Sequence, residues 1–162
     1  GCYGQEISQV LESLKIMDFN GDIKEISKSD IEFYYRGTNL PKNVIILSAK
    51  FKWRKELNSK IENLQNSFIQ KKKKDQPSRV KTCGSTFKNP KGEKAWQLIR
   101  KTGSSKFMVG DARISEQHSN FFVNNGKAKA SDIEELINKV KKNVLEKSGV
   151  TLSLEIKIIG DK

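Results

Sequence analysis

The chain has 162 residues, 35% of them hydrophobic, which is enough for one folded domain or for parts of two and argues against disorder. Its 31 lysine and arginine residues outnumber 19 acidic residues, and the net charge of +12 suits nucleic acid, an anionic membrane surface or a phosphorylated substrate. No apolar run reaches the roughly 20 residues of a membrane span, and the start lacks a signal-peptide pattern, so we expect a cytoplasmic protein without a membrane partner.

The cysteine and histidine content predicts neither a disulfide framework nor a metal site. Cys2 and Cys83 lie far apart, and the chain has a single histidine. The chain begins with Gly-Cys-Tyr-Gly and has no initiator methionine, so we expect an N-terminal portion to be missing.

The first fifty residues predict strands. Val10–Phe19 and Ile23–Ile26 flank Asn20-Gly21, the strongest short hairpin signal, and together predict a β-hairpin. Within Ser27–Phe33, a serine is followed three positions later by a glutamate, which predicts a short capped helical turn before the Tyr34–Gly37 loop. The serine and glutamate of that box are Ser29 and Glu32.

A strand and a long helix follow. Val44–Trp53 alternates, which predicts a strand with one wet face; the other face carries Leu47, Ala49, Phe51 and Trp53. From Lys55 to Lys74, apolar residues recur every three or four positions, which indicates an amphipathic helix. Its last four residues are lysines, either a solvated helix end or a contact to phosphate or nucleic acid. Residues 75–81 are expected to be a linker.

The second half mixes helices and short strands. Glu93–Lys101 predicts a helix with Trp96 and Ile99 on one side, stopped by Gly103. Val109–Ser115 and Phe121–Asn124 are expected to be strands. Ser131 with Glu134 forms a capping box for a helix that closes near Gly149. Thr151–Ile159 alternates like a strand, with Glu155 pointing away from the apolar face beside Ser153 and Lys157. This order predicts an α+β fold.

The stretch Gly84-Ser-Thr-Phe-Lys-Asn-Pro90 concentrates a hydroxyl, a cation and an amide in a loop. Gly84 permits backbone angles closed to other residues and Pro90 ends the segment, so the polar side chains stay on a loop. Serine and asparagine also commonly satisfy turn backbones, and that structural explanation stays open.

This loop, preceded by Gln76-Pro77, resembles the signature of the UDP-N-acetylenolpyruvoylglucosamine reductase family. The resemblance extends along the whole chain. Matching motifs are Tyr3-Gly4 in Gly-x-Tyr-Gly, Tyr35-Arg36, Ala95–Ile99, Ser115–Asn124 and Glu155 in Glu-Ile-Lys-x-Ile-Gly. It implies an FAD-dependent, NADPH-linked oxidoreductase of peptidoglycan synthesis that acts on a UDP-sugar.

The resemblance also implies roles for individual residues. Reduction of an enol ether needs hydride at one carbon and a proton at its neighbour, while charge develops on the attached carboxylate. Ser85 would give the proton, and Arg36 and Glu155 would stabilise the charged intermediate. The implied cofactor-binding residues are Tyr3, Gly4 and Tyr35. The implied substrate-binding residues are Lys88, Asn89, His118 and Asn120, while a hydrogen-bonded turn role for His118 stays open. We expect Ser85, Arg36 and Glu155 to approach one cavity.

The family's glycine-rich loop for the flavin pyrophosphate has no counterpart in this sequence. We therefore expect residues 1–75 to be the end of a flavin-binding α+β domain, residues 76–150 a small α+β substrate-binding domain, and residues 151–162 a closing strand that carries the catalytic glutamate. The partner would be a missing N-terminal flavin-domain segment, and the fragment alone is expected to be inactive. Two alternatives stay open: a basic nucleic-acid-binding module, against which the aromatic residues do not interleave with the basic ones, and an inactive remnant of the reductase fold.

Overall fold

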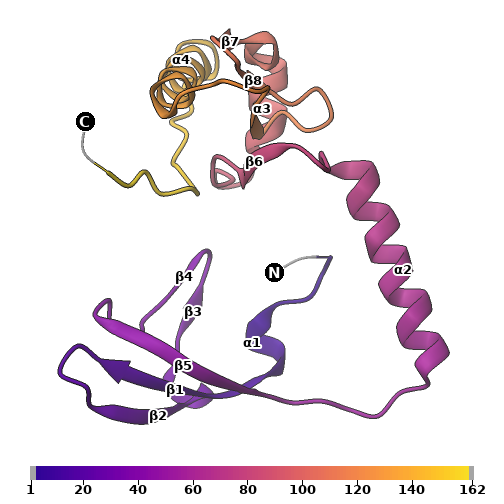
Figure 1. The fold of residues 1–162 in the computed structure, drawn as a ribbon, viewed down its shortest axis with the longest axis vertical. Coiled ribbons are helices and arrows are strands. Elements are labelled where there is room, and N and C mark those ends of the chain that lie inside the picture. The colour runs from indigo at the N-terminus through magenta and orange to yellow at the C-terminus, as the bar shows by residue number, and fades with distance from the viewer. Residues whose placement is uncertain (1–2, 161–162) are drawn as a thin grey trace. The chain divides into compact units, whose positions relative to one another are not determined.

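The computed structural model describes residues 3–160 and shows an α+β protein that divides into two compact units (Figure 1). The N-terminal unit ends at Phe68, and the C-terminal unit begins at Ile69, within a helix that both share. None of the helices in the described range is long and apolar enough to cross a membrane. The predicted domain boundaries at 75 and 150 stay a prediction.

The N-terminal unit is built on a three-stranded antiparallel sheet in the order β2-β1-β5. Its elements are α1 (Ile7–Val10), β1 (Leu11–Asp18), β2 (Ile23–Ser27), a 3-10 turn (Lys28–Asp30), β3 (Phe33–Tyr34), β4 (Gly37–Thr38) and β5 (Val44–Phe51). The predicted β1–β2 hairpin is confirmed, and the Asp18 carboxylate accepts hydrogen bonds from the backbone N–H groups of Asn20 and Asp22 in its turn. The predicted capping box at Ser29 is wrong, because the 3-10 turn begins directly after Ser27.

The strand β5 forms as predicted, but the expected buried face is wrong. Apart from the half-buried Val44, every residue of β5 is exposed, and Trp53 lies beyond the strand with 82% of its surface accessible. The physical reason is position: β5 is an edge strand, and the core of this unit forms around the central strand β1 instead. That small core consists of Leu11, Leu14, Ile16 and Ile31.

The long helix α2 (Asn58–Asp75) confirms the predicted helix but not the burial of its apolar stripe. Leu57 precedes it and, like Ile61 and Leu64 within it, is about half or more exposed, whereas Phe68 is half-buried. The lysine run from 71 to 74 is exposed in the last turn, where positive charge complements the helix dipole. The amide nitrogen of Gln117 donates to the carbonyls of Lys73 and Lys74, both at 2.8 Å, and so satisfies two acceptors at the end of the helix.

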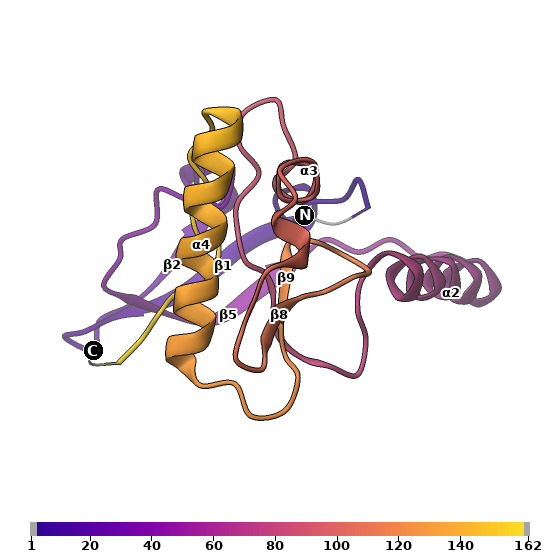
Figure 2. The ribbon, with the colours of Figure 1, turned by 90° about the horizontal axis from the view of Figure 1, so that it is seen from above.

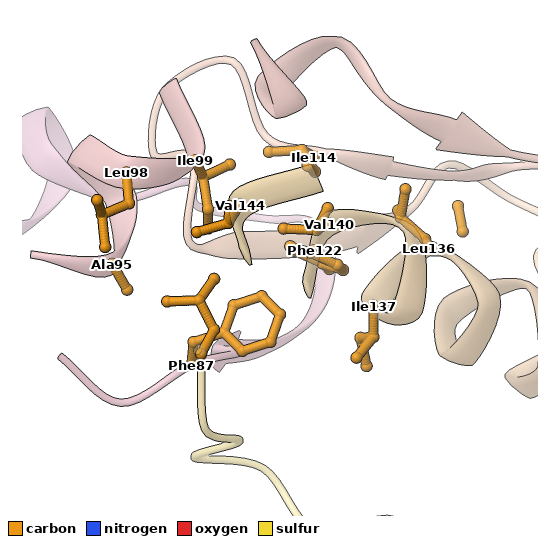
Figure 3. Packing of buried hydrophobic residues seen from close by; sticks show 12 residues of the cluster. Phe87, Ala95, Leu98, Ile99, Ile114, Phe122, Leu136, Ile137, Val140 and Val144 are labelled. Atoms are coloured by element: carbon orange, nitrogen blue, oxygen red, sulfur yellow. The ribbon is translucent and has the colours of Figure 1, made fainter. Parts of the chain in front are cut away.

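The C-terminal unit packs two helices on a four-stranded antiparallel sheet in the order β6-β9-β8-β7 (Figure 2). Its elements are β6 (Lys81–Ser85), α3 (Ala95–Lys101), a 3-10 turn (Ser104–Lys106), β7 (Met108–Val109), β8 (Ala112–Ile114), β9 (Phe121–Asn124) and α4 (Ala130–Ser148). Apolar side chains from the sheet and both helices interlock around Phe87 (Figure 3). The fully buried members include Phe87, Ile99, Leu136, Val140, Val144 and Leu152.

Three predictions in this unit need correction. The helix α4 begins earlier than the predicted cap at Ser131 and Glu134, because the Asp132 carboxylate accepts from the backbone N–H of Lys129 at 2.8 Å. The predicted strand from Val109 to Ser115 is a hairpin of β7 and β8. The last segment, 151–159, forms one isolated bridge rather than a regular strand. The predicted end of α4 at Gly149, with φ of 71°, is confirmed.

Candidate active site

The loop that carries Ser85 begins with a β-bulge. Thr82 pairs with Val123, and Ser85 pairs with Phe121. Two residues of β6, Cys83 and Gly84, therefore lie opposite the single residue Phe122 of β9. Gly84 is the extra residue and has a φ of 84°, a left-handed conformation that costs other residues energy. A bulge bends its strand and re-aims the next side chain, and here that side chain is Ser85.

The segment after Ser85 lies between two other pieces of chain. On one side, the backbone N–H of Thr86 donates to the carbonyl of Asn120 at 2.7 Å. On the other side, the carbonyl of Thr86 accepts from the backbone N–H of Glu155 at 2.9 Å, and the N–H of Lys88 donates to the carbonyl of Ser153 at 2.8 Å. The structure therefore places the backbone of Glu155 next to Thr86, the residue that follows Ser85, although Glu155 and Thr86 lie 69 positions apart in the sequence.

Glu155 is half-buried, and its Oε2 atom is buried, whereas its neighbours Ser153 and Lys157 are exposed. The alternation of the sequence predicted a solvated position like theirs. The difference arises because the bridge between Phe87 and Leu154 holds this segment against the Ser85 loop, while Leu152 fills the core beneath it. A carboxylate held close to a hydroxyl-bearing loop is a common feature of sites that move protons.

Two of the predicted substrate-binding residues use their side chains to hold the backbone. The Oδ1 atom of Asn89 accepts from the N–H of Ala95 at 3.1 Å, at the first residue of α3. Asn120 is 4% exposed, and its side-chain amide accepts from the backbone N–H of Phe87 and donates to the carbonyl of Phe87. Lys88 is half-buried.

His118 is half-buried between aromatic rings. Its ring centroid lies 4.7 Å from that of Phe121 and 6.3 Å from that of Trp96. Its Nδ1 atom accepts from the backbone N–H of Asn120 at 3.2 Å, so the proton of the neutral ring sits on Nε2. Burial lowers the pKa of His118 from 6.5, although a backbone hydrogen bond and Asp75 partly oppose this. The ring is therefore a neutral hydrogen-bond donor at pH 7.

The predicted cofactor residues and Arg36 gather in the N-terminal unit. Tyr3, Gly4, Tyr35 and Arg36 line one pocket of about 390 Å³. The Arg36 guanidinium lies 5.0 Å from the centre of the Tyr35 ring, a cation–π distance. The ring of Tyr3 stacks on Phe68 at 5.2 Å.

Arg36 has a strained backbone. It occupies the two-residue turn between β3 and β4 with a φ of 60°, where an L-residue pays about 1–2 kcal/mol and glycine is usual. Gly37 follows it, and an added Cβ there would meet the Tyr34 ring at 2.1 Å. Strain of this kind is often retained where a side chain has a function, which draws attention to Arg36.

Sequence reasoning missed the residues that support these groups. Thr82 accepts a hydrogen bond from the N–H of Gly84 at 3.2 Å inside the bulge, and Phe87 is the anchor that buries the loop. Gln117, whose side chain donates to two carbonyls in the last turn of α2, was also missed. The polar strand β6 gave little signal, since its pairing partner lies nearly forty residues away.

The C-terminal part of the chain matches a known family. Residues 76–159 match the family described as UDP-N-acetylenolpyruvoylglucosamine reductase, C-terminal domain. The chain is 44% identical over 160 residues to the UDP-N-acetylenolpyruvoylglucosamine reductase of Rickettsia bellii, covering 99% of this chain and 53% of that relative. It is 42% identical over 160 residues to the same-named protein of Rickettsia prowazekii, covering 99% of this chain and 54% of that relative.

A solved structure agrees with these sequence matches. The crystal structure of UDP-N-acetylenolpyruvylglucosamine reductase from Thermus caldophilus superposes with a TM-score of 0.83 at 32% identity, covering 97% of this chain and 56% of that one. The chain spans about half the length of the relatives it matches. On this evidence the chain belongs to the UDP-N-acetylenolpyruvoylglucosamine reductase family and contains its C-terminal domain.

Proposed function

We propose that this chain is the C-terminal half of an enzyme that reduces the enolpyruvyl ether of UDP-N-acetylglucosamine to UDP-N-acetylmuramate in peptidoglycan synthesis. Family membership suggests the reaction. The observation that carries the proposal for this chain is the hydrogen bond from Glu155 N–H to the carbonyl of Thr86, which brings a carboxylate residue to the Ser85 loop. A hydroxyl and a carboxylate from distant parts of the sequence are thus available to one substrate group.

The roles follow from the chemistry of the double bond. Hydride adds to the terminal carbon of the enolpyruvyl group, and the electron pair moves to the carbon that bears the carboxylate. Ser85 Oγ gives its proton to that second carbon, and a later proton from solvent restores the hydroxyl. The positive charge of Arg36 stabilises the charge that develops on the substrate carboxylate, and Glu155 contributes as the protonated acid, by donating its O–H to that group. Lys88 and the neutral Nε2–H of His118 bind anionic groups of the substrate.

An FAD cofactor, reduced by NADPH, supplies the hydride when bound. The flat ring system of FAD can stack on an aromatic side chain, and its phosphates can bind a cation and exposed backbone N–H groups. The pocket lined by Tyr3, Gly4, Tyr35 and Arg36 provides these groups. We propose that these residues hold part of the flavin nucleotide.

We also propose that the active protein contains a further segment of the flavin-binding domain. The support is the exposed surface of β5, an edge strand whose outer backbone groups and apolar side chains are open to another strand. The exposed apolar residues on it are Ile45, Ile46, Leu47 and Phe51.

The test joins this chain to the part of the Rickettsia bellii relative that it does not match. We expect this chimera to bind FAD and to oxidise NADPH when the enolpyruvyl substrate is added. The Ser85→Ala variant should still let NADPH reduce the flavin but should slow substrate reduction by about 10²–10⁴-fold, the usual effect of removing a positioned acid. The control is Ser78→Ala, an exposed serine in the preceding segment. An unchanged rate with Ser85→Ala would exclude Ser85 as the acid, and a chimera that folds and binds FAD without turnover would favour an inactive remnant.

A further inference from the structure

Asn120 is buried and makes three hydrogen bonds to the segment that follows Ser85. Its Oδ1 accepts from the backbone N–H of Phe87 at 2.9 Å, and its Nδ2 donates to the carbonyl of the same residue at 2.8 Å. Its own carbonyl accepts from Thr86 N–H at 2.7 Å. Because Phe87 offers one donor and one acceptor, only one orientation of the amide fits, and the side chain is fixed.

The Asn120 amide lies where the pairing of β6 with β9 stops, and there it takes over the hydrogen bonding of the backbone. The regular pairing of β6 with β9 ends at Ser85 and Phe121, immediately after the bulge. Beyond that point, the side-chain amide of Asn120 bonds to both the N–H and the carbonyl of Phe87. It thus supplies the donor and the acceptor that a residue of a paired strand would supply. Phe87 is 1% exposed, so water does not offer its backbone a substitute partner.

The far edge of the same segment holds Glu155. Thr86 and Lys88 bond to Glu155 and Ser153, and Phe87 bridges to Leu154. The chain from Thr86 to Lys88 therefore lies between the Asn120 amide and the segment that carries Glu155. A shift of Phe87 away from Asn120 would move the carbonyl of Thr86 to which Glu155 is bonded.

We propose that Asn120 is a positioning residue, which holds Phe87 so that Ser85 and Glu155 keep one relative placement, and that it does not contact the substrate. This replaces the role of substrate ligand that the sequence predicted for Asn120. The catalytic consequence rests on the function proposed above, whereas the structural consequence concerns the chain by itself. The two are therefore measured separately.

The structural test is amide hydrogen exchange on the 162-residue chain. In Asn120→Ala, we expect protection to fall by about tenfold or more at Phe87 and also at Glu155, whose N–H has no bond to Asn120, because a buried donor loses its partner. Amides in the middle of α4 should keep their protection, which shows that the unit stays folded. The matched control is Asn125→Ala, an exposed asparagine just beyond β9. Unchanged protection at Phe87 would overturn the proposal.

A second variant uses protonation as a built-in rescue. In Asn120→Asp, the ionised carboxylate accepts from Phe87 N–H but sets an oxygen against the Phe87 carbonyl. The protonated acid carries an O–H that replaces the lost donor. Protection at Phe87, corrected for the intrinsic exchange rate, should therefore rise as pH falls in this variant and stay constant in the wild type. An equal pH profile in both proteins would contradict the proposal that the Asn120 amide holds Phe87.

The catalytic test uses the chimera. Asn120→Ala should lower kcat for substrate reduction by about 10–100-fold and leave KM within about twofold, because misplacing a proton donor slows the chemical step more than binding. A raised KM with unchanged kcat would instead show a direct substrate contact. If the unsubstituted chimera folds and binds FAD but has no activity, the proposed function fails, while the exchange data still decide whether the Asn120 amide holds Phe87.

Discussion

Replacing Gly84 by alanine tests whether the bulge sets the geometry of the Ser85 loop. Gly84 has a φ of 84°, and an added Cβ would meet no atom within 4 Å, so the whole cost is backbone strain. The left-handed conformation costs an L-residue about 1–2 kcal/mol. Alanine recovers about 0.4–1 kcal/mol by restricting the unfolded chain. The expected net loss is therefore about 1 kcal/mol.

Thermal unfolding of the C-terminal unit measures this loss. Trp96 is half-buried in that unit, and the other tryptophan, Trp53, is replaced by phenylalanine so that the fluorescence reports on Trp96 alone. A loss of 1 kcal/mol corresponds to a fall in Tm of roughly 4–8 °C for a unit of this size. The control is Gly84→Asn, since asparagine tolerates the left-handed region better than alanine and should lose less.

A Tm for Gly84→Ala equal to that of the wild type would refute the reasoning, because it would mean that the bulge is absent in solution or relaxes without cost. A fall much larger than the expected range, shared by Gly84→Asn, would also refute it, because the cause would then be steric rather than conformational. In the chimera, Gly84→Ala should slow substrate reduction while FAD stays bound, since the bulge lies in the Ser85 loop and not in the predicted flavin pocket.

Two further predictions concern other groups. Arg36→Gly should give a more stable N-terminal unit in urea unfolding than Arg36→Ala by about 1 kcal/mol, because both lose the contact with Tyr35 but only glycine relieves the positive φ; equal stabilities would show that no strain is present. Because burial lowers the pKa of folded His118 below 6.5, the unfolded chain binds the proton more readily, so this residue should reduce the stability of the C-terminal unit as pH falls below about 6.5. His118→Asn keeps an acceptor for the N–H of Asn120 and should remove that part of the pH dependence, as urea midpoints between pH 5 and pH 7.5 would show.

Elements with strong local signals could be predicted from the sequence. The β1–β2 hairpin follows from a turn signal between two alternating segments, and α4 follows from five apolar residues at helical spacing and a terminal glycine. The start of α4 was misplaced because the sequence offers a capping box at Ser131 and Glu134, whereas in the structure the N-cap is Lys129, whose N–H donates to the carboxylate of Asp132. Lysine is not among the residues favoured at an N-cap, so the sequence pattern gave no signal at Lys129.

The surroundings of the candidate site were less predictable, because long-range contacts determine them. The burial of Glu155 depends on a bridge between Phe87 and Leu154. The hydrogen bonds of the Asn120 amide to Phe87 join residues 33 positions apart. The exposure of β5 depends on its place at the edge of a sheet, whereas its alternating sequence is equally suited to a covered strand. Periodicity reports which face of an element is apolar, and it does not report what lies against that face.

The order of the residues from Gly84 to Pro90 has a physical explanation. Gly84 forms the bulge, Phe87 anchors the loop in the core, the backbone of Lys88 pairs with Ser153, and Asn89 accepts from the first N–H of α3. Each of these positions holds the backbone on a different side, so the segment is constrained over its whole length. The hydroxyl of Ser85 lies at the start of this constrained segment, directly after the bulge that aims it. A rigid backbone lowers the cost of placing a proton donor against one carbon of a substrate, which is why a loop of this composition suits an acid catalyst better than a flexible turn.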